Sequence, residues 1–247
     1  MELKEFFEKY PRAALGFSGG VDSAYLLYAG KKYGADIRPY FIKTAFQPEF
    51  ELRDAIRLAK ELDVGLTVIR HDILAEDRVA ENLADRCYYC KSALFHALKQ
   101  QAVEDGYNVL LDGTNASDEA SDRPGMKAIR ELEVLSPLRE CGLTKGEIRR
   151  LSREAGLFTW EKPSYACLAT RVPAGNPLTA EILAKIEKGE DALTAMGFSD
   201  FRIRVFHDAA RLQLPESQLK LAVQKREELL KILKPHFPTV LLDLETR

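Results

Sequence analysis

The string SGGVDS at positions 18–23 has the residue types of an anion-binding loop. It follows the apolar run AALGF at 13–17, and a helical pattern begins directly after it. Two adjacent glycines let backbone N–H groups turn towards a ligand, and the helix N-terminus adds its positive dipole end. Asp22 alone would repel phosphate, which favours a Mg²⁺ ion between them. An ordinary Gly-Gly turn is the alternative. The string has neither the Walker lysine nor the dinucleotide spacing.

Cysteines supply a second candidate site. The chain has four, and Cys87 and Cys90 form a Cys-x-x-Cys pair flanked by an arginine and a lysine. In a reducing compartment such a pair points to metal, cluster or thiol chemistry, and nearby cations favour the thiolate. Structural zinc normally takes four ligands, with Cys141 as a candidate for the fourth. A disulfide relay and buried small side chains remain open as alternatives.

Two further stretches have residue types suited to a ligand. Arg202 and Arg204 lie two apart in FRIRVF, and since strand side chains alternate, both are expected on one face. Two guanidinium groups there can hold a phosphate, and a solvent-exposed face is the alternative. The acidic segment from Asp112 follows an apolar run, at the strand end where open α/β sheets bind ligands. A solvated turn is the alternative there.

Alternating apolar runs and helical patterns must position these residues. Strands are predicted over 13–17, 37–43, 66–70, 108–113 and 133–138, and helices over 21–33, 48–63, 91–105 and 144–155. Alternation of this kind predicts an α/β fold, a parallel sheet with helices on both faces.

Residues 156–178 interrupt the alternation and predict a long loop, a kind of segment that is often functional. Beyond it we expect a small α+β domain, built from helices over 179–196 and 216–234 and strands over 201–206, 210–214 and 239–243. The predicted domains are residues 1–170 and residues 171–247.

Bulk composition excludes several classes of protein. The 247 residues carry a net charge of −2, which argues against a protein that clamps long nucleic acid. The stretch MELKEFFEKY lacks the apolar core of a signal peptide, and no apolar run approaches the ~20 residues that span a bilayer. We therefore expect a cytoplasmic protein without a membrane span, in which disulfides are disfavoured.

SGGVDS resembles the PP-loop of the ATP pyrophosphatases, which cleave ATP between the α and β phosphates and adenylate an oxygen of the substrate. Three further stretches, DGTNASD with RPG, ACLATR, and RIR with the AR that follows, resemble the LarE sulfur transferases over residues 13–243. This resemblance implies a PP-loop domain followed by a substrate-binding domain, with ATP and Mg²⁺ as cofactors. The implied substrate is pyridinium-3,5-biscarboxylic acid mononucleotide, a small nucleotide whose carboxylates are adenylated and then receive sulfur. The product is a precursor of the nickel-pincer nucleotide used by lactate racemase.

The resemblance also implies roles for individual residues. Those matching the nucleotide site are Ser18, Gly19, Gly20, Asp22, Ser23, Asp112, Gly113 and Thr114. Those expected to bind the substrate are Arg202, Arg204, Glu190 and Arg171. Those expected to be catalytic are Cys167, Asp22 and Lys91. The family forms ring-like homo-oligomers, and we expect one here.

The source of sulfur divides this family. In one branch a single cysteine gives up its sulfur and becomes dehydroalanine after one turnover, and Cys167 alone would match that branch. Together, Cys87, Cys90 and Cys167 suit a [4Fe–4S] cluster with one iron lacking a protein ligand. That iron would hold a hydrosulfide, from sulfide or another sulfur donor, for transfer to the adenylate. We therefore expect a catalytic enzyme, with Cys141 as a buried small residue outside the cluster.

Three other functions compete with this interpretation. A tRNA-thiolating enzyme with the same loop would need a basic tRNA-binding module, and residues 171–247 carry mixed charge. A nucleotide-sensing module would keep the fold without catalysis. An ammonia-using synthetase would leave the three cysteines without a role.

Overall fold

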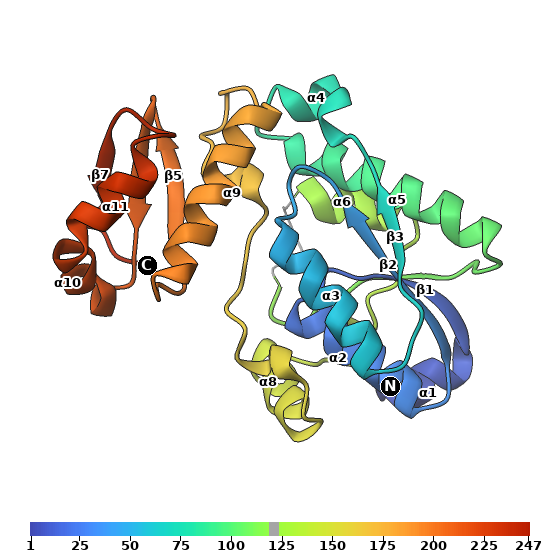
Figure 1. Ribbon diagram of the computed structural model, residues 1–247. Helices are drawn as coiled ribbons and strands as arrows, with labels where there is room; N and C mark the ends of the chain where they lie inside the picture. Colours follow the sequence, from blue (N-terminus) through green and yellow to red (C-terminus); the bar gives the residue numbers. More distant parts are fainter. Residues whose placement is uncertain (119–123) are drawn as a thin grey trace. The chain divides into compact units, whose positions relative to one another are not determined.

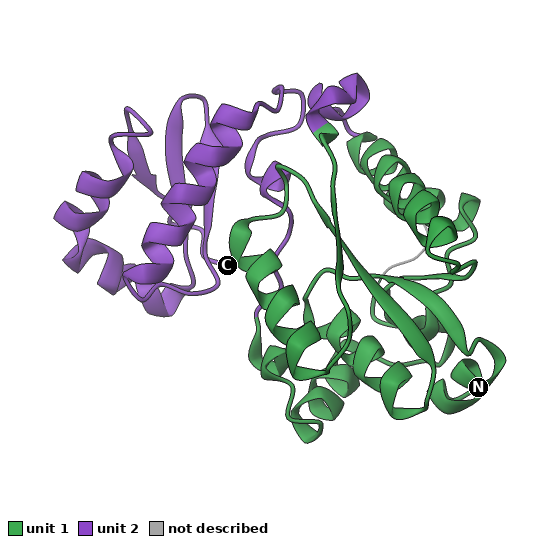
Figure 2. Ribbon diagram, turned by 45° about the vertical axis from the view of Figure 1, so that its right-hand side comes forward, with its two compact units in different colours: residues 1–73, 85–162 green, residues 74–84, 163–247 purple. Residues whose placement is uncertain are grey.

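The computed structural model describes residues 1–118 and 124–247 (Figure 1). The chain divides into two compact units (Figure 2). Unit 1 consists of Met1–Ile73 and Asp85–Lys162, and unit 2 of Leu74–Ala84 and Pro163–Arg247. In the structure, the last segment of unit 2 begins at Pro163, whereas the boundary expected from the sequence is at residue 170. Unit 2 also includes residues 74–84, which come from earlier in the chain.

Hydrogen bonds of Asn82 explain why residues 74–84 belong to unit 2. Its side-chain amide donates to the carbonyls of Pro173 at 2.8 Å and Asn176 at 2.9 Å, and its own carbonyl accepts from the N–H of Gly175. Asn82 is 1% exposed and has φ +57°, a region that asparagine tolerates better than most residues. These contacts join segments about 90 residues apart, which no local pattern predicts.

A parallel four-stranded sheet of order β3–β2–β1–β4 forms the centre of unit 1. Its strands are β1 (Arg12–Gly16), β2 (Asp36–Lys43), β3 (Thr67–Arg70) and β4 (Leu110–Leu111). The side chains of β1 alternate between two cores: Ala13 and Leu15 pack into one, and Ala14 into the other. Both faces of the sheet are therefore buried, and the α/β fold expected from the alternation is confirmed.

Helices of unit 1 supply these two cores. The first core includes residues of α1 (Leu3–Lys9), α2 (Val21–Lys32), α3 (Glu49–Glu61), α7 (Pro137–Glu140) and α8 (Lys145–Glu154). The second includes residues of α5 (Arg86–Glu104) and α6 (Pro124–Glu131), which lie side by side in Figure 1. The 3₁₀ turns are η1 (Ile73–Ala75), at the junction of the units, and η2 (Phe158–Glu161).

Two sequence-based element boundaries in unit 1 are wrong. The strand expected over 133–138 is a single bridge between Leu111 and Leu135, because Pro137 has no N–H to extend a ladder and begins α7 instead. The helix expected over 91–105 begins at Arg86, so the Cys-x-x-Cys pair lies inside its first turns. The hydroxyl of Tyr88 donates to Glu131 of α6 at 2.6 Å, a tertiary contact that supports these turns.

Unit 2 has a three-stranded sheet of order β5–β6–β7. β5 (Arg202–Phe206) and β6 (Ala209–Gln213) are antiparallel, and β7 (Val240–Leu242) runs parallel to β6. The helices are α4 (Asp77–Ala80), α9 (Ala180–Ala195), α10 (Glu216–Gln224) and α11 (Arg226–Leu233), with the 3₁₀ turn η3 (Leu168–Arg171). The single helix expected over 216–234 is wrong: it breaks at Lys225.

Close packing holds α9 on this sheet. A Cβ added at Gly189 would lie 2.8 Å from Cδ1 of Ile203 on β5 and 3.1 Å from Leu233 on α11. The glycine therefore lets the helix approach the strand, which brings the next residue of α9, Glu190, onto β5. Within the described ranges, no helix combines the length and apolar character needed to cross a membrane.

Candidate functional site

The loop between β1 and α2 has the geometry of an anion site. Gly19 has φ +70°, which favours glycine, and a Cβ there would come within 3.2 Å of backbone atoms of Glu51 and Ala55 on α3. The Ser18 and Ser23 hydroxyls lie 3.2 Å apart. Hydroxyl groups and the first N–H groups of α2 are thus gathered at the carboxyl end of β1, the edge at which open α/β sheets bind ligands.

Asp22 stands in the first turn of α2 and contacts two neighbours. The amide of Asn115 donates to one carboxylate oxygen at 3.3 Å, and the ammonium of Lys145 lies 2.5 Å from the other. The Asp22 side chain is 21% exposed, so it is accessible from the loop. The carboxylate is an oxygen ligand of the kind that Mg²⁺ prefers.

The segment after β4 forms the second wall of the site. Asp112 is 6% exposed and accepts hydrogen bonds from the Ser136 hydroxyl at 2.7 Å and from the Thr114 N–H at 3.1 Å. These bonds fix the backbone of Gly113 against α2, where a Cβ would lie 3.1 Å from the Ser23 nitrogen. Residues 119–123 of this segment, including Arg123 of the RPG motif, lie outside the described residues.

A cavity of about 310 Å³ joins these segments. Its polar side includes Ser18, Asp22, Ser23, Asp112, Thr114 and Lys91. Its apolar side includes Ile42, Leu94, Phe95, Leu98 and Ile129. An apolar wall beside convergent polar groups is the usual composition of a ligand pocket, and it suits a base at one end and phosphates at the other.

Gly113→Ala tests this geometry. The added methyl group would press on the first turn of α2 and displace the loop by a few tenths of an ångström. We expect ATP to bind about tenfold more weakly, since small displacements at a phosphate site have large effects. Isothermal titration with a non-hydrolysable ATP analogue measures the change, and Gly146→Ala, where an added Cβ meets nothing within 4 Å, is the matched control. Equal affinity for the analogue in both variants would contradict the geometry.

The thiols are divided between the two units. Cys87 is exposed and Cys90 half-buried, one turn apart on the same side of α5, and the Arg86 guanidinium lies 3.8 Å from the Cys87 sulfur. Cys167 caps η3 in unit 2. Across residues 1–118 and 124–247, no group of three or more His, Cys, Asp or Glu side chains is arranged to hold a metal ion.

Cys141 differs from the other thiols. It is the C-cap of α7 and packs against the first core of unit 1. Burial, as the largest cause, raises the pKa of its thiol, which favours the protonated form. This agrees with a small side chain that fills space.

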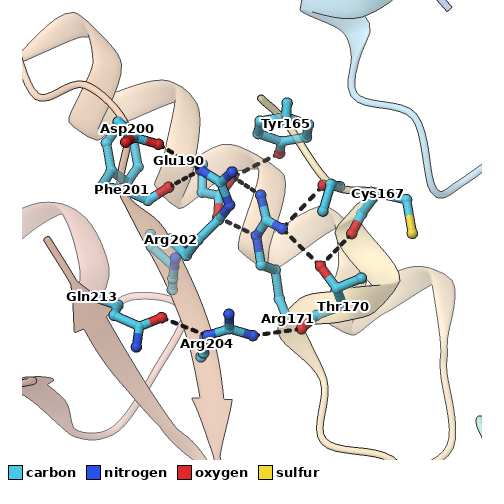
Figure 3. Close-up of polar contacts among 12 residues, drawn as sticks. Tyr165, Cys167, Thr170, Arg171, Glu190, Asp200, Phe201, Arg202, Arg204 and Gln213 are labelled. Atoms are coloured by element: carbon cyan, nitrogen blue, oxygen red, sulfur yellow. Dashed lines mark hydrogen bonds and ion pairs between the residues drawn. The ribbon is translucent and has the colours of Figure 1, made fainter. Parts of the chain in front are cut away.

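A buried ion pair holds the loop before η3 onto unit 2 (Figure 3). Arg171, whose side chain is 1% exposed, pairs with Glu190 through two contacts of 2.7 and 3.2 Å. It also donates to the Ala166 carbonyl at 3.0 Å. Glu190 further accepts the Tyr165 hydroxyl and the Ile203 N–H. Both charged groups are thus engaged with the protein, in the manner that buried charges require.

From β5, Arg202 reaches the loop before η3 and Arg204 reaches η3 itself. Arg202 donates to the Ser164 carbonyl at 2.6 Å, and Arg204 donates to the Thr170 carbonyl at 2.9 Å. Desolvation and the neighbouring Arg171 lower the pKa of Arg202 to about 10, and the same two causes lower that of Arg204. We call Arg171, Arg202 and Arg204 the arginine cluster.

The arginine cluster has an excess of positive charge. Its three guanidinium groups face one buried carboxylate, Glu190, and a more distant one, Asp200, which lies 3.9 Å from Arg202. Desolvation by burial is the largest cause of the fall in the two pKa values, and crowding of like charges adds to it. A bound anion would relieve the crowding. In Figure 3 the Cys167 side chain points away from the cluster.

Two lysines at the loop were not predicted from the sequence. Lys145 contacts Asp22, and Lys162 contacts the Gly19 carbonyl and Asp54. Both are over 120 residues from the loop in the chain. Lys162 directly precedes the PSYACLATR stretch, and this position next to a motif is the one local feature that could have drawn attention to it.

A parallel sheet with a serine- and glycine-rich loop after β1 and a nucleotide-sized cavity defines an α/β nucleotide-binding protein of the PP-loop superfamily. No family model matches the chain. The chain is 35% identical over 225 residues to an uncharacterized protein of Synechocystis, covering 90% of this chain and 83% of that protein. It is 32% identical over 210 residues to the pyridinium-3,5-bisthiocarboxylic acid mononucleotide synthase of Lactiplantibacillus plantarum, covering 84% and 76%.

The chain therefore belongs to the family of this synthase, the LarE sulfur transferases. It is also 30% identical over 182 residues to the tRNA-specific 2-thiouridylase MnmA of Pseudothermotoga lettingae, covering 59% of this chain and 52% of that protein. These relatives make it an enzyme of the ATP-dependent, sulfur-transferring kind.

Proposed function

We propose that this enzyme adenylates the carboxylates of pyridinium-3,5-biscarboxylic acid mononucleotide and replaces their oxygen by sulfur, in nickel-pincer nucleotide biosynthesis. The relative from L. plantarum is named for a bisthiocarboxylic acid mononucleotide. A biscarboxylic acid with the same ring is the simplest precursor of that product. The observation that supports the proposal most is the cavity of unit 1, where the serine and glycine loop meets Asp22 and Lys91.

The chemistry has two steps. A carboxylate oxygen of the substrate attacks the α phosphorus of ATP, and the bond to the leaving pyrophosphate breaks. Sulfide sulfur then attacks the acyl carbon of the adenylate, and the bond to AMP breaks, which leaves a thiocarboxylate. A second round on the other carboxylate gives the bisthio product.

Unit 1 has the groups that the first step needs. Ser18, Gly19, Gly20 and Ser23 would hold the pyrophosphate, and Asp22 would hold Mg²⁺, which neutralises charge on the phosphates. The segment after β4, with Asp112, Gly113 and Thr114, would bind the rest of the nucleotide. Lys91, which lines the cavity from α5, would stabilise the negative charge that develops at the α phosphate.

Unit 2 would bind the substrate. The excess positive charge of the arginine cluster supports recognition of the substrate's phosphate by Arg202 and Arg204. The Arg171–Glu190 pair, expected from the sequence to contact substrate, would act by holding η3 and the loop before it, which the two arginines reach. Residues 1–170 as an ATP-binding domain and 171–247 as a substrate-binding domain remain our assignment of roles.

The sulfur source is the finer part of the proposal. Thiolates are the usual ligands of an iron–sulfur group, and two of the three thiols share one side of α5 beside a guanidinium. Cys87, Cys90 and Cys167 would hold a [4Fe–4S] cluster, which would supply sulfide to the activated carboxylate. Sacrifice of Cys167 in a single turnover is the alternative.

Iron analysis distinguishes these two routes. Protein purified without oxygen should contain iron and absorb visible light, and Cys87→Ala, Cys90→Ala and Cys167→Ala should each lose most of the iron. Cys141→Ala, with its raised thiol pKa, should keep it. Colourless, iron-free wild-type protein would exclude the cluster and favour the sacrificial route.

AMP release tests the function as a whole. With MgATP, sulfide and the biscarboxylic acid mononucleotide, we expect AMP formation that depends on the nucleotide. A tRNA-thiolating enzyme would instead form AMP with tRNA and bind it with a steep salt dependence. The match to the synthase of L. plantarum covers 84% of this chain and the match to the MnmA relative from P. lettingae 59%, which favours the small substrate. We also expect a homo-oligomer, which light scattering would measure.

A further inference from the structure

Lys162 places a largely buried ammonium group beneath the loop. Its Nζ donates to the Gly19 carbonyl at 3.4 Å and lies 2.6 Å from Oδ2 of Asp54 on α3. The side chain is only 16% exposed. Removing a cation from water is unfavourable unless it is paired, and the partners of this one are the Asp54 carboxylate and the Gly19 carbonyl.

Other residues of unit 1 contact both the backbone and the ammonium group of Lys162. Arg149 of α8 donates to the carbonyls of Trp160 at 2.5 Å and of Lys162 itself at 2.8 Å, which fixes its backbone. The Phe50 ring of α3 lies 5.2 Å from the ammonium. Lys162 is therefore ordered on unit 1, of which it is the last residue.

Contact with the Gly19 carbonyl has a consequence for the next N–H group. The Gly19 carbonyl and the Gly20 N–H belong to one planar trans peptide, so they point in opposite directions. A cation at the oxygen polarises that peptide and strengthens its N–H as a donor. The Gly20 N–H makes only a long bond of 3.3 Å to the Ser18 hydroxyl, so an anion can compete for it.

We propose that Lys162 is a positioning residue for the pyrophosphate of ATP, acting through the Gly19–Gly20 peptide. The ammonium holds the carbonyl on the far side of the loop, and the N–H of the same peptide then faces the phosphates. This inference rests on the proposed function, because it presumes that the loop binds pyrophosphate. The competing explanation is a purely structural ion pair between Lys162 and Asp54.

Binding of two ligands to three variants tests the inference. The ligands are magnesium pyrophosphate and AMP, which lacks the two phosphates that leave, and the variants are Lys162→Met, Lys162→Arg and Asp54→Asn. We expect Lys162→Met to bind pyrophosphate about tenfold more weakly, the usual effect of losing one charge-assisted contact. Its affinity for AMP should stay within about twofold of that of wild type. Lys162→Arg should restore pyrophosphate affinity to within about threefold, because arginine also donates to a carbonyl.

Asp54→Asn is the matched control. It removes the ion pair and leaves the ammonium on the Gly19 carbonyl, so pyrophosphate affinity should change by less than about threefold if the carbonyl contact matters. An effect of Asp54→Asn equal to that of Lys162→Met would overturn the inference, and so would equal weakening of AMP and pyrophosphate. Unchanged pyrophosphate binding by Lys162→Met would overturn the inference about Lys162 but not the proposed function. If wild-type protein binds neither ligand, the proposed function fails as well.

Discussion

Glu190→Gln is expected to lower the free energy of unfolding of unit 2 by about 3 to 5 kcal/mol, the usual effect of removing one partner of a buried ion pair. The carboxylate is the nearest negative charge to the arginine cluster and also accepts the Tyr165 hydroxyl and the Ile203 N–H. Without its charge, three guanidinium groups would repel one another in a region of low solvent access. Chemical denaturation followed by circular dichroism and by hydrogen exchange on β5 measures the loss.

Glu181→Gln is the control for this prediction. Glu181 lies on the same helix and pairs with Lys185, but the carboxylate is exposed, and surface pairs contribute little. Its effect on the unfolding of unit 2 should be small. A loss of stability no greater for Glu190→Gln than for Glu181→Gln would show that the pair does not hold the loop before η3.

Cys167→Ser should separate the two chemical steps. We expect thiocarboxylate formation to fall by at least about a thousandfold, the scale seen when an essential catalytic group is removed. Release of pyrophosphate in the first turnover should remain within about threefold of wild type, because adenylation uses the loop of unit 1 and no thiol. Quantifying pyrophosphate and thiocarboxylate in the same reaction measures both effects.

Cys141→Ser is the matched substitution. The Cys141 thiol belongs to the core beside α7 and has no part in the proposed sulfur route, so both products should form nearly as in wild type. Thiocarboxylate formation by Cys167→Ser at the wild-type rate would contradict the role given to Cys167.

The sheet and the loop of unit 1 could be predicted from local patterns. Apolar runs predicted the positions of β1, β2 and β3, and their alternation with helical patterns predicted a parallel sheet. The anion loop was visible because a buried strand, two glycines and a helix start stand in immediate succession. These features depend on interactions between residues that are close in the chain, so the sequence alone is enough to predict them.

Features set by tertiary contacts could not be predicted in this way. The start of α5 depends on Tyr88 meeting Glu131 of α6, although tyrosine and cysteine are weak helix formers. The break at Lys225 has no glycine or proline to mark it. The place of residues 74–84 in unit 2 depends on hydrogen bonds from Asn82 to residues near 175.

The candidate site shows the same division. Ser18, Asp22 and Asp112 follow the ends of strands and could be placed at one edge of the sheet from sequence. Lys145 and Lys162 reach that edge from distant helices and turns, so no local pattern indicates their contacts. Strand alternation predicted one face for Arg202 and Arg204, but the Glu190 carboxylate that accepts the Ile203 N–H between them comes from α9.

The most direct test of the account is a stoichiometry. Wild-type protein, prepared without oxygen, is supplied with MgATP, sulfide and pyridinium-3,5-biscarboxylic acid mononucleotide, and AMP and thiocarboxylate sulfur are measured together over time. The account predicts equal amounts of AMP and incorporated sulfur, both absent when the mononucleotide is omitted. AMP formation that ignores the mononucleotide, or that proceeds without incorporation of sulfur, would contradict it.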